Sequence, residues 1–257
     1  FLFLKKKIVL FTYGLEVWGA NKNFKYKFLI HKINFFVCMR EFTKKKLIER
    51  YNLKNKYIYS LHNFIDDFKK FKKVKKQNII LTIARLDGNE KFKGIDETLE
   101  SISLIKEKKF IYYILGDGDD KNRLIQKSRS LKLDKNVKFL GYVSNKKKIE
   151  YLRKSKILSM PGSDKTFDTY PYRFSFLEAA NYSLNILASK PFNDEINQAK
   201  KYGIYAFVNP KNRTGIKKNI IKLLNKKNFI SKKLHLDFSK KKFCLNLNKI
   251  IMDIIYK

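Results

Sequence analysis

The sequence predicts an α/β protein built on a doubly wound parallel sheet, with helices covering both faces of the strands. Three observations predict this fold class. Apolar runs of strand length alternate along the chain with longer segments of helical spacing, which is the order of βαβ units. The strand runs are continuously apolar, as is typical of strands buried on both faces. Glycine and charged residues follow several of these runs, where the ligand-binding loops of such sheets lie.

The first part of the chain contains three strand-like runs and one helix-like segment. The expected strands are Lys7–Tyr13, Asn34–Met39 and Lys56–Leu61. Glu41–Tyr51 is expected to be a helix, because its apolar residues fall on one side. Phe68–Gln77 is mostly lysine and phenylalanine without usable periodicity, and we expect it to be a linker.

The alternation is clearest after Gln77. The expected strands are Asn78–Ala84, Phe110–Leu115, Val137–Leu140, Ile157–Met160, Asn185–Ala188 and Tyr205–Val208. The expected helices are Ile95–Lys106, Lys121–Leu131, Lys146–Arg153, Phe174–Tyr182, Asp194–Tyr202, Asn212–Asn225 and Leu245–Tyr256. Right-handed crossovers would join these strands into one sheet, with ligands at the carboxyl ends of the strands.

The composition limits the classes of protein to which the chain can belong. Its 257 residues are 44% hydrophobic, which is enough for a folded core. Cys38 and Cys244 lie far apart, and the three histidines are scattered, so there is no zinc signature and no disulfide framework. This pattern fits a reducing, intracellular setting. No window approaches the run of about 18 apolar residues that a membrane span requires.

The formal net charge of +35 has two interpretations. An anionic partner, either nucleic acid or an acidic membrane leaflet, would be attracted to such a chain. Compositional drift explains the charge equally well, because 50 of the 58 basic residues are lysine and only eight are arginine. Base-reading proteins favour the planar fork of arginine, and no helix is rich in arginine, so we expect no nucleic-acid partner.

The loop Arg85–Gly94 follows an expected strand and precedes an expected helix. Arg85 at the strand end and Lys93 at the helix start bring two cations to a helix N-terminus, which suits a pyrophosphate. The alternative is that both are solvated charges in a lysine-rich chain.

Two further strand ends carry glycine turns. In Gly116–Asp120 the glycine lets a ligand approach the backbone, and the acidic residues can cap the next helix. Alternatively, Asp117 and Asp119 hold a divalent cation on their carboxylate oxygens. The backbone of the turn Gly141–Val143, with Tyr142 at its centre, can contact a planar nucleobase.

The fourth loop runs from Met160 through Ser163 to a helix that opens near Phe174. Glu178 lies one turn into that helix, among apolar residues, so it needs a partner if it is buried. Ribose hydroxyls would serve, and so would an arginine such as Arg173.

These four loops, in this order, resemble those of glycosyltransferase family 4, the group 1 glycosyl transferases. The similar segments lie between Ile79 and Glu195 and read LTIARLDGNEKFKGIDETLESI, YYILGDGDDKNRL, NVKFLGYV, ILSMPGS and FLEAANYSLNILAS. Before them, YGLEVWGA, FFVCMREFTKKKLIERYNL and YSLHNFIDDF resemble the end of the family's acceptor domain. The resemblance implies the GT-B fold, with a Rossmann-like donor domain and the C-terminal part of a second Rossmann-like acceptor domain.

The resemblance also implies roles for single residues. Arg85 and Lys93 match the basic pair that neutralises the donor diphosphate, and Glu178 matches the glutamate that holds the ribose; these three are the implied catalytic residues. The implied donor-binding residues are Gly116, Tyr142, Val143, Ser163, Tyr172, Arg173, Phe174 and Glu178. The basic pair takes the place of a metal ion, so no metal and no other cofactor is implied. Asp117 and Asp119 are then turn residues, whereas the rival one-domain GT-A transferases use such a pair to bind metal.

The sequence departs from the family pattern at the first glutamate of the Glu-x7-Glu motif. Tyr170 stands at that position, and Tyr170–Arg173 replaces the usual Glu-Gly-Phe-Gly. Asp168 or Asp164 is a candidate substitute on the same loop. The family often has histidine where Tyr13 stands, and a glycine–proline pair where Leu184–Asn185 stands.

The resemblance implies three segments: 1–72, a remnant of the acceptor domain with a linker; 73–238, the donor-binding domain; and 239–257, a helix that packs back towards the acceptor domain. We expect an N-terminally truncated piece of a longer enzyme.

The implied function is a retaining, hexosyltransferase-type reaction that moves a sugar from a UDP- or GDP-sugar to a glycan or lipid-linked glycan. We expect a cytoplasmic location, peripheral on the inner face of the membrane, and a role in cell-envelope polysaccharide. The alternative is a non-catalytic nucleotide-sugar binding module or a degenerate transferase fragment.

Overall fold

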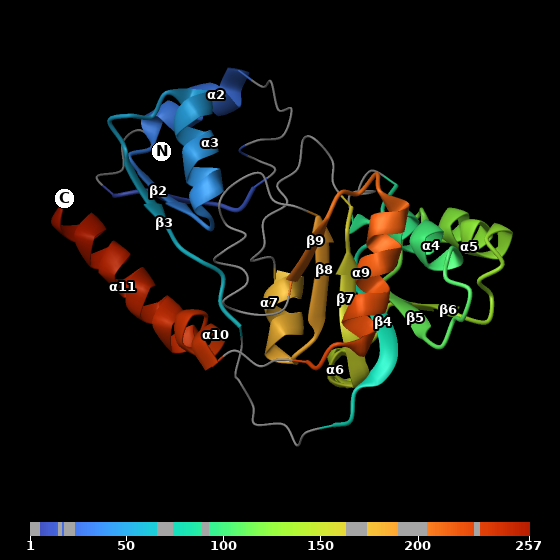
Figure 1. The fold of residues 1–257 in the computed structure, drawn as a ribbon. Coiled ribbons are helices and arrows are strands. Elements are labelled where there is room, and N and C mark those ends of the chain that lie inside the picture. Colours follow the sequence, from blue (N-terminus) through green and yellow to red (C-terminus); the bar gives the residue numbers. More distant parts are fainter. Residues whose placement is uncertain are drawn as a thin grey trace. The chain divides into compact units, whose positions relative to one another are not determined.

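A computed structural model describes residues 6–14, 17, 24–65, 74–88, 93–162, 174–189, 205–228 and 232–257 (Figure 1). The chain divides into two compact units. We call them the terminal unit, Phe1–Asp67 with Leu236–Lys257, and the central unit, Phe68–His235. The expected boundaries, after residues 72 and 238, separate segments by their expected role, whereas the two units are defined by compactness. The expected division into an acceptor remnant, a donor-binding domain and a closing helix therefore stays a prediction.

The central unit contains a six-stranded parallel sheet in the order β6-β5-β4-β7-β8-β9. The strands are β4 (Gln77–Ile83), β5 (Ile111–Leu115), β6 (Val137–Gly141), β7 (Ser155–Met160), β8 (Asn185–Ser189) and β9 (Tyr205–Val208). The chain builds outward from β4 in one direction and from β7 in the other, so the topological switch point lies between these two strands. The predicted doubly wound parallel sheet is confirmed.

Helices cover both faces of this sheet. They are α4 (Ile95–Ser103), α5 (Lys121–Ser130), α6 (Asn145–Lys154), α7 (Phe174–Asn181) and α9 (Arg213–Asn225). On one face α4 packs against α5 and α9, and Ile80 of β4 belongs to the buried cluster that they form. Leu81 points to the other face and is also fully buried. Leu152 of α6 and Leu177 of α7 are fully buried outside that cluster. The expected helix Asp194–Tyr202 lies outside the described residues.

The terminal unit contains a smaller parallel sheet in the order β1-β2-β3. Its strands are β1 (Val9–Thr12), β2 (Phe35–Cys38) and β3 (Tyr57–Ser60). Leu47 of α3 (Glu41–Tyr51) packs with Phe36 in one cluster. Leu247 of α11 (Lys240–Tyr256) packs against Val37 in another. None of the helices in the described ranges is both long and apolar enough to cross a membrane.

Two helices were not predicted, α2 (Phe24–Lys32) and α10 (Lys232–Asp237). In α2 the apolar residues form no stripe of helical spacing, since Phe28 and Leu29 are exposed whereas Ile30 is buried. With six residues, α10 is too short for its periodicity to be recognised. The expected linker Phe68–Gln77 is one residue too long at its end, because Gln77 already belongs to β4 and pairs with Ser155 in the sheet.

Lysine side chains cap the C-terminal ends of several helices. Lys76 Nζ donates hydrogen bonds to the carbonyl oxygens of Leu152 at 3.1 Å and Tyr182 at 2.6 Å, at the ends of α6 and α7. Lys156 donates to the carbonyl oxygen of Leu224 at 2.7 Å, in the last turn of α9. An amino group at this end of a helix satisfies carbonyl groups that lack an intrahelical partner, and its charged form is stabilised by the helix dipole. Burial lowers the pKa of Lys76 to about 7, so the stabilisation by charge is smaller there.

A cluster of charged side chains joins α4, α5 and α9. Arg123 donates two hydrogen bonds to the carboxylate of Asp96, at 2.8 and 2.7 Å, and Lys127 donates to the same carboxylate at 2.6 Å. Glu100 accepts hydrogen bonds from Lys127 and Arg213. Partial burial raises the pKa of Asp96, but the hydrogen bonds from Arg123 and Lys127 outweigh this effect and lower the pKa to about 2.

Asp96→Asn is expected to lower the free energy of unfolding by about 1–2 kcal/mol at pH 7, after allowance for screening by solvent. A carboxylate whose pKa is depressed on folding stabilises the protein above its unfolded pKa, and this stability is lost as the pH falls through the folded value. The difference between the variant and the unchanged protein should therefore shrink between about pH 5 and about pH 2. Urea unfolding at several pH values measures it.

Asp134→Asn is the matched control, because Asp134 lies 3.9 Å from Arg129 and both side chains are well exposed. Asp134→Asn is expected to lower the free energy of unfolding by less than about 0.5 kcal/mol. Equal losses in the two variants, or a loss for Asp96→Asn that does not change with pH, would contradict the role given to the cluster.

Candidate functional site

The carboxyl ends of β4 and β7 meet at the switch point, and the segments that follow them are in backbone contact. Gly94 is the N-cap of α4 and has a φ of 81°. A Cβ atom at Gly94 would lie 2.1 Å from the amide nitrogen of Gly162, just after β7. Glycine allows both this backbone conformation and this close approach. The N-terminus of α4 is therefore fixed beside the end of β7, where ligands bind in sheets of this type.

The loop after β5 is held against the loop after β4 in a similar way. Gly116 has a φ of 134°, and a Cβ atom there would lie 1.8 Å from the carbonyl oxygen of Ala84. The N–H of Leu86 donates a hydrogen bond to the carbonyl oxygen of Asp117 at 2.9 Å. The backbone on either side of Arg85 is thus anchored to the neighbouring loop.

The acidic residues of the β5 loop make contacts typical of a turn. The carboxylate of Asp117 accepts hydrogen bonds from Lys121 Nζ at 2.9 Å and from the N–H of Gly118 at 3.0 Å, and these bonds lower the pKa of Asp117. Asp119 accepts from the N–H of Gly88 at 2.9 Å. In the part of the chain that the structure describes, no group of three or more His, Cys, Asp and Glu side chains is arranged to hold a metal ion. Independence from metal stays a prediction.

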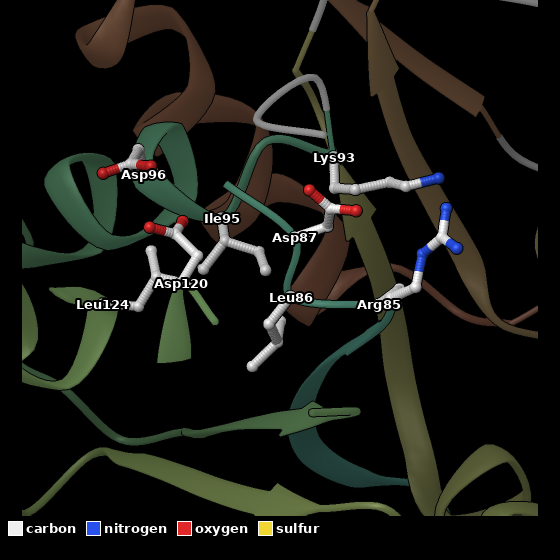
Figure 2. Close-up of a pocket in the computed structure, with 8 residues that line it drawn as sticks. All are labelled: Arg85, Leu86, Asp87, Lys93, Ile95, Asp96, Asp120 and Leu124. Carbon is white, nitrogen blue, oxygen red and sulfur yellow. The ribbon is translucent and has the colours of Figure 1, made fainter. Parts of the chain in front are cut away.

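A pocket at this edge of the sheet is lined by Arg85, Leu86, Asp87, Lys93, Ile95, Asp96, Asp120 and Leu124. Figure 2 shows the charged ends of Arg85 and Lys93 pointing to the same side, with the carboxylate of Asp87 next to Lys93. The first turn of α4 adds backbone N–H groups and the positive end of the helix dipole. The lining also includes Asp96 and Asp120, which are both paired with Arg123. The charged ends of Arg85 and Lys93 point away from these two carboxylates, so it is the side of the pocket at Arg85 and Lys93 that suits an anion such as a diphosphate.

The third loop, after β6, lies beside the second. The N–H of Gly116 donates a hydrogen bond to the carbonyl oxygen of Gly141 at 2.8 Å. The side chain of Tyr142 is 88% exposed, and Val143 is half-buried. An exposed aromatic ring at a ligand-binding edge is suited to stacking on a flat partner.

Glu178 lies in α7, one turn after the exposed Phe174, and its carboxylate pairs with Lys148 of α6. The distance from Lys148 Nζ to Glu178 Oε1 is 2.7 Å. The sequence alone suggests ribose hydroxyls or Arg173 as the partner. It does not single out Lys148, which is one of three consecutive lysines at Lys146–Lys148.

Part of the expected site cannot be placed. Residues Ser163, Asp164, Asp168, Tyr170, Tyr172 and Arg173 lie outside the described residues. The described part brings Arg85 and Lys93 to one pocket, sets Gly116 and Tyr142 on adjoining loops, and gives Glu178 a cationic partner.

Solved structures show which class of protein has this architecture. The pneumococcal O-GlcNAc transferase GtfA, in complex with UDP and GlcNAc, is 12% identical with a TM-score of 0.69, over 91% of this chain and 48% of that one. A glycosyltransferase from Rickettsia africae is 17% identical with a TM-score of 0.70, over 92% and 68%. HepE from Anabaena, in complex with UDP and glucose, is 12% identical with a TM-score of 0.69, over 95% and 71%. The fold is that of the GT-B glycosyltransferases.

The family itself follows from the sequence. The family model described as "Glycosyl transferases group 1" matches residues 63–242, so the chain belongs to the group 1 glycosyl transferase family, as its motifs indicate. No curated protein gives a significant match. The chain spans about half the length of the first solved structures that it matches.

Gly94→Ala is expected to lower the free energy of unfolding by at least about 2 kcal/mol, because the new Cβ meets backbone atoms that have little room to move. Gly88→Ala is the matched control in the same loop, since its Cβ would lie 3.7 Å from its nearest neighbour, a side-chain oxygen of Asp119. Gly88→Ala should change the free energy of unfolding by less than about 1 kcal/mol. Urea unfolding measures both variants, and equal stabilities would contradict the close approach of Gly94 to Gly162.

Proposed function

We propose that this chain carries the donor-binding part of a retaining glycosyltransferase that transfers a hexose from a nucleotide diphosphate sugar to an acceptor hydroxyl. The observation that carries the proposal is the meeting of Arg85, Lys93 and the N-terminus of α4 at one pocket beside the switch point (Figure 2). Membership of the group 1 family supports this class of reaction.

The proposed role of the basic pair follows from where charge develops. In the transfer, the bond between the anomeric carbon and the diphosphate oxygen breaks, and negative charge builds up on the leaving nucleotide. The guanidinium of Arg85 can donate two parallel hydrogen bonds to phosphate oxygens, and Lys93 adds a compact positive charge. Donors held in place before the reaction stabilise such charge without reorganising. We therefore assign to Arg85 and Lys93 the task that a metal ion performs in other transferases.

The nucleoside would lie along the neighbouring loops. Gly116 would approach the phosphates, Tyr142 and Val143 would contact the base, and Glu178 would hold the ribose. The loop before α7 would complete the site with Ser163, Tyr172, Arg173 and Phe174. UDP is the first nucleotide to test, because the GtfA and HepE structures contain it, and GDP is the second.

The acceptor that we propose is a glycan or lipid-linked glycan of a cell-envelope polysaccharide, reached at the cytoplasmic face of the membrane. A net charge of +35 would favour peripheral contact with an anionic leaflet, although compositional drift explains this charge equally well. The chain covers about half of the first matched structures. The acceptor and the site that binds it are therefore proposed for the whole protein. No nucleic-acid partner is proposed.

A non-catalytic nucleotide-sugar binding module is the second candidate function. The observation that favours it is Tyr170, which stands where the family motif has the glutamate that handles the donor sugar. Such a module would bind the donor without transferring the sugar, unless Asp164 or Asp168 replaces the glutamate.

Calorimetric titration of the full chain with UDP and GDP is the test of the donor site. One nucleotide is expected to bind with the same affinity in the presence of EDTA. Arg85→Ala and Lys93→Ala should each weaken binding of that nucleotide by about tenfold, because each removes a charge-assisted contact to the diphosphate. Binding of the corresponding nucleoside, which lacks the diphosphate, should change by less than about twofold.

Lys218→Ala is the matched control, because it removes the same charge from an exposed position on α9. Lys218→Ala is expected to change the affinity for the nucleotide by less than about twofold. Binding that requires a divalent cation would favour the alternative in which Asp117 and Asp119 hold that cation and the cation contacts the diphosphate. Failure of both nucleotides to bind would contradict the proposed function.

A further inference from the structure

The pair formed by Lys148 and Glu178 joins two of the segments that build the proposed donor site. Lys148 lies in the first turn of α6, which follows the Tyr142–Val143 loop, and its backbone N–H donates to the carbonyl oxygen of Ser144 at 2.9 Å. Glu178 lies on α7, which follows the loop after β7. Their contact at 2.7 Å therefore connects the expected base-binding side to the expected ribose-binding side.

The surroundings make this pair more than a surface ion pair. The two side chains are 25% and 27% exposed, so water screens them only in part. The neighbours of Glu178 in the chain, Leu177 and Ala179, are fully buried. Burial, and next the negative charge of Glu178, raise the pKa of Tyr182 one turn further along. A carboxylate in such a place loses hydration, and the ion pair with Lys148 compensates for that loss.

The pair retains capacity for a ligand. An ionised carboxylate offers about four acceptor positions on its two oxygens, and the ion pair with Lys148 is made through Oε1. Two neighbouring hydroxyls of a ribose are donors that one carboxylate can accept together. Glu178 by itself would repel the negative charge of a bound diphosphate, and the ammonium group of Lys148 offsets that charge.

We infer that Lys148 is a positioning residue that holds the carboxylate of Glu178 towards the ribose hydroxyls, so that preference for ribonucleotides over 2′-deoxyribonucleotides depends on Lys148. The inference rests on the proposed function, since it requires the nucleotide to bind at this edge of the sheet. Lys148 acts through Glu178 and is not a catalytic residue.

The test compares the affinities of the full chain for UDP and 2′-deoxy-UDP, or for GDP and 2′-deoxy-GDP if GDP is the ligand. The unchanged protein is expected to prefer the ribonucleotide by about tenfold, the value of one hydrogen bond to a charged group. Lys148→Met should reduce this preference to about twofold or less, and Glu178→Gln should reduce it as well. Lys148→Arg should retain most of it, because a guanidinium also donates to a carboxylate.

Lys147→Met is the matched control on the same helix, since Lys147 pairs with Glu150 at 3.2 Å, away from Glu178. It should keep the preference of the unchanged protein. The ratio of the two affinities separates positioning from structural damage, because damage to the fold weakens binding of both nucleotides alike. A melting temperature measured for each variant accompanies the titrations.

Each outcome decides the inference. Loss of the ribose preference in Lys148→Met, with the preference kept in Lys147→Met and Lys148→Arg, supports it. An unchanged preference in Lys148→Met overturns it and leaves the proposed function intact. Equal affinity of the unchanged protein for the two nucleotides overturns it as well, because Glu178 then does not bind the ribose hydroxyls. If neither nucleotide binds, the proposed function fails and the inference fails with it.

Discussion

The contact between Gly94 and Gly162 is the constraint on which the site depends. It leaves no space for a Cβ atom, and so it fixes the start of α4 against the end of β7. Lys93 at the start of α4 and Arg85 on the anchored loop after β4 both line the pocket, and their charged ends point to the same side (Figure 2). Within the described residues, the glycines with positive φ are Gly94, Gly116, Gly118 and Gly141, and all of them lie at this edge of the central sheet. Among the eight glycines that the structure describes, the positive-φ conformations are therefore found where a ligand would approach.

The many lysines of this chain have several separate structural uses, so their number is poor evidence for an anionic partner. Lys76 and Lys156 satisfy carbonyl groups at the ends of helices, and Lys7 does the same for Ile254 at 2.9 Å in α11. Lys127 neutralises Asp96 inside the cluster between α4 and α5. A long flexible stem with three donors suits all these tasks. The functional assignment of Lys93 therefore comes from its position beside Arg85 at a helix start, and not from its charge.

The sequence predicts the sheet well and the contacts of the site poorly, for physical reasons. The strands of the central sheet are buried on both faces, so they are continuous apolar runs that stand out from the helices between them. The four loops are predictable because parallel strands place their carboxyl ends at one edge. Two ion pairs are not predictable, Lys148–Glu178 and Arg123–Asp96. Each joins two different helices, and the spacing of residues in the sequence does not show which helices the crossovers bring together. Helix α2 is not predictable from the sequence, because tertiary packing and not amphipathic spacing stabilises it.

If a donor binds at this edge, as we propose, charge attracts it and fixed geometry must select it. A net charge of +35 draws any anion towards the chain, and salt screens that attraction over about 10 Å at moderate ionic strength. Attraction of this kind does not distinguish a nucleoside diphosphate from a free phosphate or an acidic lipid. The edge also holds carboxylates, which oppose a bound anion unless a neighbouring cation offsets them. They are Asp87, Asp96 and Asp120 in the pocket and Glu178 on α7. Selection therefore depends on where the few anchored groups lie: an arginine held between bonded loops, a helix start pressed against a strand end, and a carboxylate tied to a lysine.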